Sequence, residues 1–198
     1  MPCFNQVIEP SAFVQEKYLE PKFVYSGSVA KWQCFEETIY IFAAIKKALP
    51  NAKLSVLTNM IEQAKRIVEN VGLSDVDIKN VPYQQLPEEM KKYKYGFLIR
   101  SKHKLNEVAT PTKMSSYLGN GLIPIFSPVI KDFDDNLGNL KYIVNAGKET
   151  ELIEQILELE QKQILSKDIY AEYKQVFDNY YCRDKYVNAI SDLLNKYD

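Results

Sequence analysis

The sequence has little of what several classes of protein require. Its 198 residues include three cysteines, Cys3, Cys34 and Cys182, an odd and widely spaced set that suits neither a disulfide framework nor a zinc site. It has one histidine, His103, which excludes a multi-histidine metal centre; it lies in a polar stretch and we expect it at the surface. We therefore expect reduced thiols, a cytoplasmic protein and no bound metal or cofactor.

An excess of charge and a long apolar run are also missing. With 25 basic and 26 acidic side chains the net charge is −1, which gives no electrostatic footprint for nucleic acid. No apolar run is long enough to span a bilayer, and the N-terminus lacks the basic and apolar regions of a signal peptide. Hydrophobic residues at 46% and charged residues at 26% are typical of a soluble globular protein, and the length suits one domain.

Short apolar strands alternate with helical stretches along most of the chain. We expect strands at 23–26, 54–57, 76–78, 95–99, 122–126 and 142–144, and helices at 34–49, 60–71, 87–93 and 110–120. This alternation predicts an α/β fold with a single Rossmann-like, doubly wound parallel sheet of about six strands. The expected core consists of apolar strand residues: Phe23, Val24, Tyr25, Leu54, Val56, Leu57, Phe97, Leu98, Ile99, Ile123 and Ile125.

The chain divides into three segments by pattern. Residues 1–20 show no clear periodicity and are interpreted as an interdomain connector. Residues 21–148 are predicted to form the Rossmann-like domain, and residues 149–198 are predicted to be C-terminal helices that pack on it.

The stretch from Thr110 to Gly121 is predicted to be a short helix that binds an anion. Thr110 suits the N-cap, Pro111 suits the first helical position, and Gly121 can end the helix in a left-handed conformation. Lys113 in the first turn weakens the helix itself, which indicates a compensating anion. The alternative is an ordinary capped helix.

A second candidate site follows the first strand. Gly27 lets the backbone come close to a bound group, Ser28 exposes N–H and hydroxyl donors, and Lys31 is within reach. Arg100 follows the fourth strand, and ligands of parallel sheets bind beyond the carboxyl ends of the strands. The alternatives are a solvated surface lysine for Lys31 and a salt bridge at the strand end for Arg100.

Three blocks, in order and with matching spacing, resemble the donor-binding, C-terminal half of GT-B retaining glycosyltransferases of the large family 4 type. The resemblance covers roughly residues 21 to 145. The blocks are Phe23-Val24-Tyr25-Ser26-Gly27-Ser28-Val29-Ala30-Lys31-Trp32-Gln33, Leu86-Pro87-Glu88-Glu89-Met90 through Tyr95-Gly96-Phe97-Leu98-Ile99-Arg100, and Thr110-Pro111-Thr112-Lys113-Met114-Ser115-Ser116-Tyr117-Leu118-Gly119-Asn120-Gly121-Leu122-Ile123-Pro124-Ile125.

The resemblance implies a nucleotide-sugar donor, such as a UDP- or GDP-sugar, and hexosyl transfer in cell-surface polysaccharide synthesis. It implies that Lys31 and Arg100 are the catalytic residues, which stabilise charge on the departing nucleoside diphosphate. It also implies a set of substrate-binding residues: Gly27, Ser28, Tyr83, Glu107, Thr110, Thr112, Lys113 and Ser116. GT-B enzymes rely on basic residues and helix dipoles, so we discount the Asp-x-Asp pattern at 75–77 as a metal site.

Three positions depart from the family pattern. Ser116 stands where the family has a glutamate that accepts ribose hydroxyls, a loss of about 1–3 kcal/mol of binding. Glu107 lies one residue away from the usual spacing of the other acid, and Lys94 replaces an aspartate before the fourth strand.

The acceptor half of a GT-B enzyme is missing, so we expect the chain alone to be inactive and the missing half to supply any peripheral membrane association. Alternatives are a stand-alone subunit that docks on a separate acceptor-domain partner, an inactive homologue, or a flavodoxin- or receiver-like domain. A flavodoxin- or receiver-like domain would have an acidic cluster after the first strand, and the sequence has none at Tyr25-Ser26-Gly27-Ser28. A docking face is expected at the tyrosine-rich tail, made of Tyr170, Tyr173, Tyr180 and Tyr181.

Overall fold

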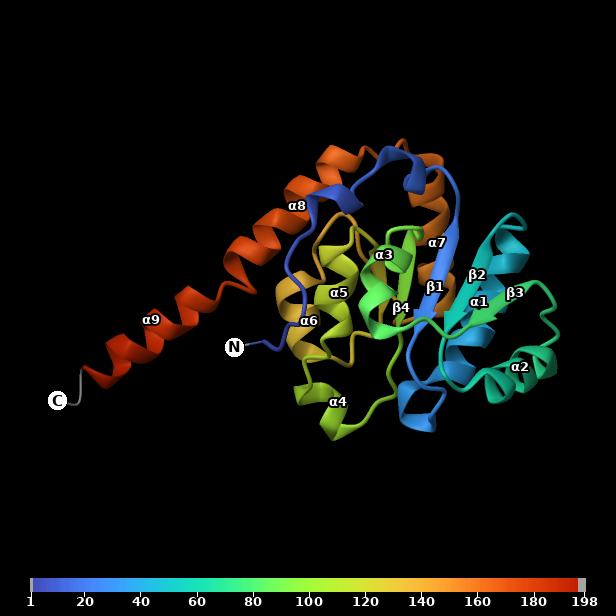
Figure 1. Ribbon diagram of the computed structural model, residues 1–198, viewed down its shortest axis with the longest axis horizontal. Coiled ribbons are helices and arrows are strands. Elements are labelled where there is room, and N and C mark those ends of the chain that lie inside the picture. Colours follow the sequence, from blue (N-terminus) through green and yellow to red (C-terminus); the bar gives the residue numbers. More distant parts are fainter. Residues whose placement is uncertain (1, 196–198) are drawn as a thin grey trace.

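The computed structural model describes residues 2–195; Met1 of the predicted connector and the last three residues of the predicted helical tail lie outside them. The chain forms one sheet flanked by helices (Figure 1). The strands are β1 (Lys22–Ser26), β2 (Lys53–Leu57), β3 (Val76–Lys79), β4 (Tyr95–Leu98), β5 (Ile123–Phe126) and β6 (Val144–Asn145). The helices are α1 (Phe35–Ala48), α2 (Ile61–Asn70), α3 (Leu86–Met90), α4 (Lys104–Val108), α5 (Lys113–Gly119), α6 (Lys131–Leu137), α7 (Glu149–Gln161), α8 (Ser166–Asn179) and α9 (Arg183–Leu194).

The six strands pair in the order β3-β2-β1-β4-β5-β6, and every pair is parallel. The predicted doubly wound, Rossmann-like sheet is therefore confirmed. The strand order reverses between β1 and β4, where Val24 pairs with Gly96. In open parallel sheets the crevice at such a switch point, beyond the carboxyl ends of the strands, is where ligands bind.

Helices cover both faces of the sheet: in Figure 1, α3 and α5 lie in front of it, and α1 and α7 lie behind. The core residues expected from the sequence are all buried. At its centre the Phe23 ring stacks on Tyr95 with centroids 4.6 Å apart and meets Phe42 of α1 edge-on at 5.6 Å. Such aromatic pairs add about 0.5–1.5 kcal/mol each beyond the burial of their area.

Helix α5 begins later than the sequence predicted. Thr112 occupies the N-cap position with no side-chain capping bond, so the prediction of Thr110 as N-cap is wrong. The physical reason is that the Thr110 hydroxyl accepts the backbone N–H of Cys3 instead. The predicted left-handed stop is confirmed: Gly121 has φ +68°, and Leu122 N–H donates to the Tyr117 carbonyl at 2.9 Å.

The N-terminal segment, residues 3–18, runs beside α5 (Figure 1). The backbone N–H of Glu9 donates to the Gly119 carbonyl at 2.9 Å, and the Tyr18 hydroxyl donates to the Gly121 carbonyl at 2.8 Å. Two short 3-10 helices, η1 (Pro10–Ala12) and η2 (Gln15–Tyr18), give the segment its turns. The N-terminal segment, which shows no sequence periodicity, is therefore held against the domain by hydrogen bonds to backbone carbonyls.

The predicted docking face on the tyrosine-rich tail is wrong, because most of these rings are in the interior. Tyr180 and Tyr181 are buried, and the buried Tyr173 hydroxyl donates to the carbonyls of Leu122 and Tyr142. Tyr170 packs edge-on against Phe13.

Helices α7 and α8 bury apolar side chains against the domain, whereas α9 buries none and projects from the body in Figure 1. No helix within residues 2–195 is both long and apolar enough to cross a membrane.

A buried ion pair fastens α7 to the start of β4. Lys94, only 2% exposed, places its ammonium 2.6 Å from a carboxylate oxygen of Glu160, which also accepts the Tyr95 hydroxyl at 2.6 Å. Burial lowers the pKa of Lys94, and the Glu160 carboxylate opposes this change. The lysine that departs from the family pattern thus has a structural partner.

Removing Glu160 should leave a buried, unpaired ammonium. We expect Glu160→Ala to lower the free energy of unfolding by about 3–5 kcal/mol, measured by urea denaturation. The matched control is Glu158→Ala on the same helix, which breaks an exposed pair with Lys162 and should change stability by less than about 1 kcal/mol. Equal losses in both variants would contradict a structural role for the buried pair.

Candidate functional site

Two neighbouring depressions lie at the carboxyl edge of the sheet, beside the switch point. The first, called here the α5 cavity, has a volume of about 330 Å³ and lies between α5, the N-terminal segment and the turn at η4 (Tyr83–Gln85) and α3. The second, called the β2 pocket, has about 310 Å³ and lies beyond the ends of β1, β2 and β3. Both include Ser26 and Leu86, so they meet at the end of β1.

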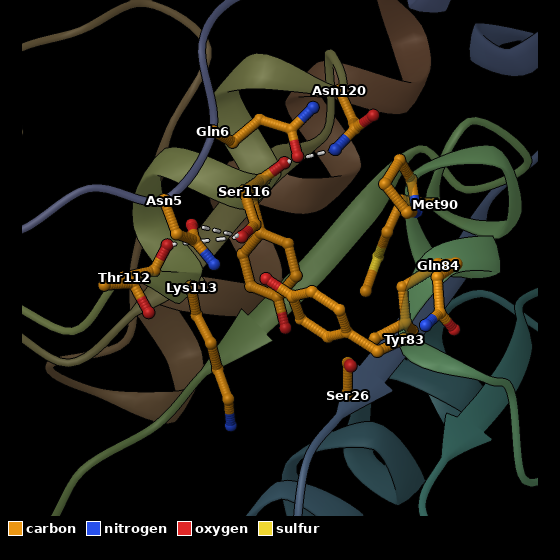
Figure 2. A pocket seen from close by; sticks show the side chains of 13 residues that line it. Asn5, Gln6, Ser26, Tyr83, Gln84, Met90, Thr112, Lys113, Ser116 and Asn120 are labelled. Carbon is orange, nitrogen blue, oxygen red and sulfur yellow. Dashed lines mark hydrogen bonds between the residues drawn. The ribbon is translucent and has the colours of Figure 1, made fainter.

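The Lys113 side chain extends from α5 toward the turn after β1, away from Asn5 and Ser116 (Figure 2). Its ammonium donates to the Gln33 side-chain carbonyl at 2.8 Å and lies 5.1 Å from the centre of the Tyr25 ring. No carboxylate within residues 2–195 forms an ion pair with it. The Gln33 side chain and the Tyr25 ring, the two groups that contact the ammonium within residues 2–195, are both neutral.

Gly27 makes this approach possible. A Cβ at this position would lie 2.6 Å from the Lys113 nitrogen, and its φ of +145° is one that residues with side chains rarely adopt. The sequence predicts that a bound group approaches the backbone at Gly27. In the structure the Lys113 ammonium occupies the space beside this glycine.

Arg100 is buried and, like Lys113, bonds to Gln33. Its guanidinium donates to the carbonyls of Ile99 at 2.9 Å and Gln33 at 3.4 Å, and lies 6.0 Å from the Trp32 ring centre. The salt bridge that the sequence left open for Arg100 does not form among the described residues.

Lys113 and Arg100 are joined through Gln33, and no carboxylate within residues 2–195 forms an ion pair with either of them. Burial, together with the charge of Arg100, lowers the pKa of Lys113 to about 7. Burial also lowers the pKa of Arg100. Among residues 2–195, no Asp or Glu lines the α5 cavity or the β2 pocket. The arrangement therefore favours an anionic ligand next to Lys113.

The structure brings some of the sequence-predicted residues together. Tyr83, Thr112, Lys113 and Ser116 line the α5 cavity, and the Tyr83 ring extends across it in Figure 2. Tyr83 is 72% exposed, so one face of its ring is free to stack on a planar group.

Gly27 and Ser28 line the β2 pocket, and so does Val81 in the loop after β3. The Ser28 carbonyl accepts the Tyr25 hydroxyl at 2.6 Å, which fixes the turn.

Four predicted residues line neither depression: the buried Arg100, and Lys31, Glu107 and Thr110. Lys31 is exposed in the short helix η3 (Lys31–Gln33), and its side chain has no hydrogen bond or ion pair within residues 2–195. Glu107, in α4, lies 3.5 Å from the ammonium of Lys131. Thr110 binds the N-terminal segment through Cys3, as described above. His103 is exposed and caps α4 through its Nδ1 atom.

Sequence reasoning missed two residues of the site. Gln33 is buried and joins both cations, through its side chain to Lys113 and its carbonyl to Arg100. Asn5 lines the α5 cavity from the N-terminal segment. No local signal distinguishes either residue, because each acts through contacts with residues 67 to 111 positions away.

The aspartates at 75–77 are engaged elsewhere. Asp75 pairs with Lys46 at 2.8 Å, and Asp77 pairs with Lys79 at 2.8 Å. Within residues 2–195 no group of three or more His, Cys, Asp or Glu side chains is arranged to hold a metal ion.

Comparison with protein-family models and with curated protein sequences finds no match. Solved structures do match. A mutant of Staphylococcus aureus TarM, in complex with fondaparinux, alpha-GlcNAc-glycerol and UDP, is 10% identical with a TM-score of 0.64, over 90% of this chain and 34% of that one. The UDP-forming α,α-trehalose-phosphate synthase from Burkholderia vietnamiensis is 11% identical with a TM-score of 0.61, over 98% of this chain and 52% of that one.

One similar structure is itself a single domain. The C-terminal domain of LpcC, a group 1 family glycosyl transferase from Francisella tularensis, is 13% identical with a TM-score of 0.57, over 90% of this chain and 94% of that one. The chain thus spans about a third of the TarM chain, but nearly all of this isolated domain. Its fold is that of the C-terminal, Rossmann-like half of a GT-B protein.

The lowered pKa of Lys113 makes stability depend on pH. Between pH 7 and about 10.4, where an unfolded lysine titrates, the unfolded chain binds one more proton at this residue than the folded chain. The free energy of unfolding should therefore rise with pH in this window. In Lys113→Met the rise should be smaller, measured by urea denaturation from pH 6 to 9.5. Lys31→Met is the control and should keep the wild-type slope; an unchanged slope in Lys113→Met would contradict the assignment.

Proposed function

We propose that this chain is the donor nucleotide-diphosphate-sugar-binding domain of a family 4-like, hexosyl-transferring glycosyltransferase, which acts in cell-surface polysaccharide synthesis. The observation that carries the proposal is a pair of cations joined through Gln33, Lys113 and Arg100, which have no carboxylate partner within residues 2–195. Lys113 lines a cavity at the switch point that no Asp or Glu of these residues lines. A diphosphate supplies the missing negative charge.

The residues around the cavity suit the parts of such a donor. The diphosphate lies against Lys113 and the open turn at Gly27 and Ser28, with Thr112 near it. The nucleobase stacks on Tyr83, whose ring is free on one face. Lys31, exposed on the same rim, and Arg100 stabilise the charge that develops on the departing nucleoside diphosphate.

The chain alone is proposed to bind the donor and not to complete a transfer, because a separate acceptor half supplies the rest of the site. One observation favours a docking surface on this edge of the sheet. Trp32 in η3 and Leu105 and Val108 in α4 are 65%, 71% and 79% exposed, in the connections that follow β1 and β4. These apolar side chains would be buried in an interface with an acceptor half in the same polypeptide. The alternative is an interface with a separate acceptor-domain subunit.

Isothermal calorimetry with the diphosphates of uridine, guanosine and cytidine tests the proposal. We expect one of them to bind with a dissociation constant between tens of micromolar and millimolar, or about −6 to −4 kcal/mol. A folded sample that gives no heat with any of the three at millimolar concentration would contradict donor binding.

The two lysines give the sharpest test of the phosphate position. Lys31→Ala and Lys113→Ala should each weaken binding of the nucleoside diphosphate by about 1–3 kcal/mol, the scale of a lost charge-assisted hydrogen bond. Binding of the bare nucleoside should change little in either variant. Calorimetry with uridine and its diphosphate measures both quantities.

The matched control is Lys53→Ala, at the amino end of β2 on the opposite edge of the sheet, which should leave both affinities unchanged. Equal losses for nucleoside and diphosphate would show that the lysines act through folding or the base, and the phosphate assignment would be wrong.

A further inference from the structure

The wall of the α5 cavity nearest the N-terminus is built by Asn5 and Ser116 (Figure 2), and the buried Ser115 lies next to them in α5. The Asn5 side-chain oxygen accepts the Ser115 hydroxyl at 3.1 Å and the Ser116 hydroxyl at 2.9 Å. The same hydroxyls lie 2.8 and 3.3 Å from the Thr112 carbonyl. The backbone N–H of Asn5 donates to Ser115 at 3.2 Å, which holds the residue against the helix.

These bonds determine what the wall offers to a ligand. The single proton of each serine hydroxyl is used within the protein, where the Asn5 oxygen and the Thr112 carbonyl are its two acceptors. The Asn5 amide nitrogen, in contrast, donates to no acceptor among residues 2–195, and the residue is exposed toward the cavity. The wall therefore presents amide donors and neutral oxygen acceptors, and neither Asn5 nor Ser116 carries a negative charge.

A wall of this kind recognises a sugar differently from a carboxylate. In dinucleotide-binding doubly wound folds an Asp or Glu binds the ribose 2′-hydroxyl, since a carboxylate has lone pairs for two hydroxyl donors. A site that depends on such a bond rejects an analogue without the hydroxyl, because the carboxylate is then left unpaired. Here Ser116 stays bonded to Asn5 whether or not that hydroxyl is present.

We propose that Asn5 and Ser116 form a neutral sugar-binding wall, and that the site consequently binds 2′-deoxyribonucleoside and ribonucleoside diphosphates with similar affinity. Asn5 contributes its amide N–H groups to acceptor oxygens of the bound nucleotide. The inference rests on the proposed function, since it concerns the nucleotide bound in the same cavity.

Calorimetry with UDP and 2′-deoxyuridine 5′-diphosphate, which differ only in the 2′-hydroxyl, tests the inference on the wild-type chain. The two dissociation constants should differ by less than about fivefold, the scale of one neutral hydrogen bond. A preference for UDP of more than about tenfold would overturn the inference and leave the proposed function standing. If neither nucleotide binds to the folded chain, the proposed function fails and the inference fails with it.

Two variants separate ligand contact from structural support. Asn5→Asp keeps an acceptor for both serine hydroxyls but loses the amide donors and adds a negative charge, so both nucleotides should bind at least about tenfold more weakly. Its control, Asn51→Asp, makes the same change in an exposed turn before β2, at the opposite edge of the sheet, and should leave affinity within about twofold. Unchanged affinity in Asn5→Asp would overturn the role of Asn5.

Ser116→Glu supplies the carboxylate that the wall lacks. It should create a preference for UDP over the deoxy analogue of about tenfold or more, the scale of a hydrogen bond to a charged group. A change in protein stability alone would shift both nucleotides equally and leave their ratio constant, so a constant ratio would overturn the position assigned to the sugar.

Discussion

The close approach of helix α5 to its neighbours is the constraint on which the site depends. The Tyr117 ring lies against Gly96 of β4, where a Cβ would be 2.9 Å from the ring. On the other side of the helix, a Cβ at Gly119 would be 2.7 Å from the Val7 carbonyl oxygen. Such distances are shorter than side chains tolerate, so larger residues here would push α5 away from the sheet or from the N-terminal segment. The position of Lys113 against the turn after β1 follows from this packing.

The N-terminal segment gives the site a wall that is distant in sequence. It bonds to Thr110 just before α5, to Ser115 and Ser116 within the helix, and to the carbonyl of Gly119 at its end. The last bond satisfies one of the terminal C=O groups that a helix leaves without an internal partner. The same contacts that order the segment also place Asn5 in the cavity, so folding and the chemistry of the site share one set of hydrogen bonds.

The sequence predicted the sheet better than the site. Buried strands of parallel sheets are short, continuous apolar runs, and this pattern located β1, β2, β4 and β5 and their core residues. The helix stop at Gly121 was predictable because a left-handed residue has few alternatives to glycine. Asn5 and Gln33 were not, because their roles come from partners far along the chain. The tail tyrosines misled because an aromatic stripe looks the same whether it packs inward on Phe13 or faces a partner.

Three lysines with little or limited exposure show why one place in the molecule calls for an anion. Lys94 has the carboxylate of Glu160 at 2.6 Å. Lys17 has no ion pair among the described residues, but its ammonium donates to the carbonyls of Asn120 at 2.6 Å and Ala12 at 3.3 Å, the first of which ends α5. Lys113 has one amide oxygen and an aromatic face, and the like charge of Arg100 adds to the effect of burial in lowering its pKa. A buried ammonium is stabilised most by a charged partner. Of these three lysines, Lys113 alone lines the α5 cavity, and no Asp or Glu within residues 2–195 lines that cavity with it. The cost of keeping this cation uncompensated is then part of the binding energy that an anionic ligand recovers.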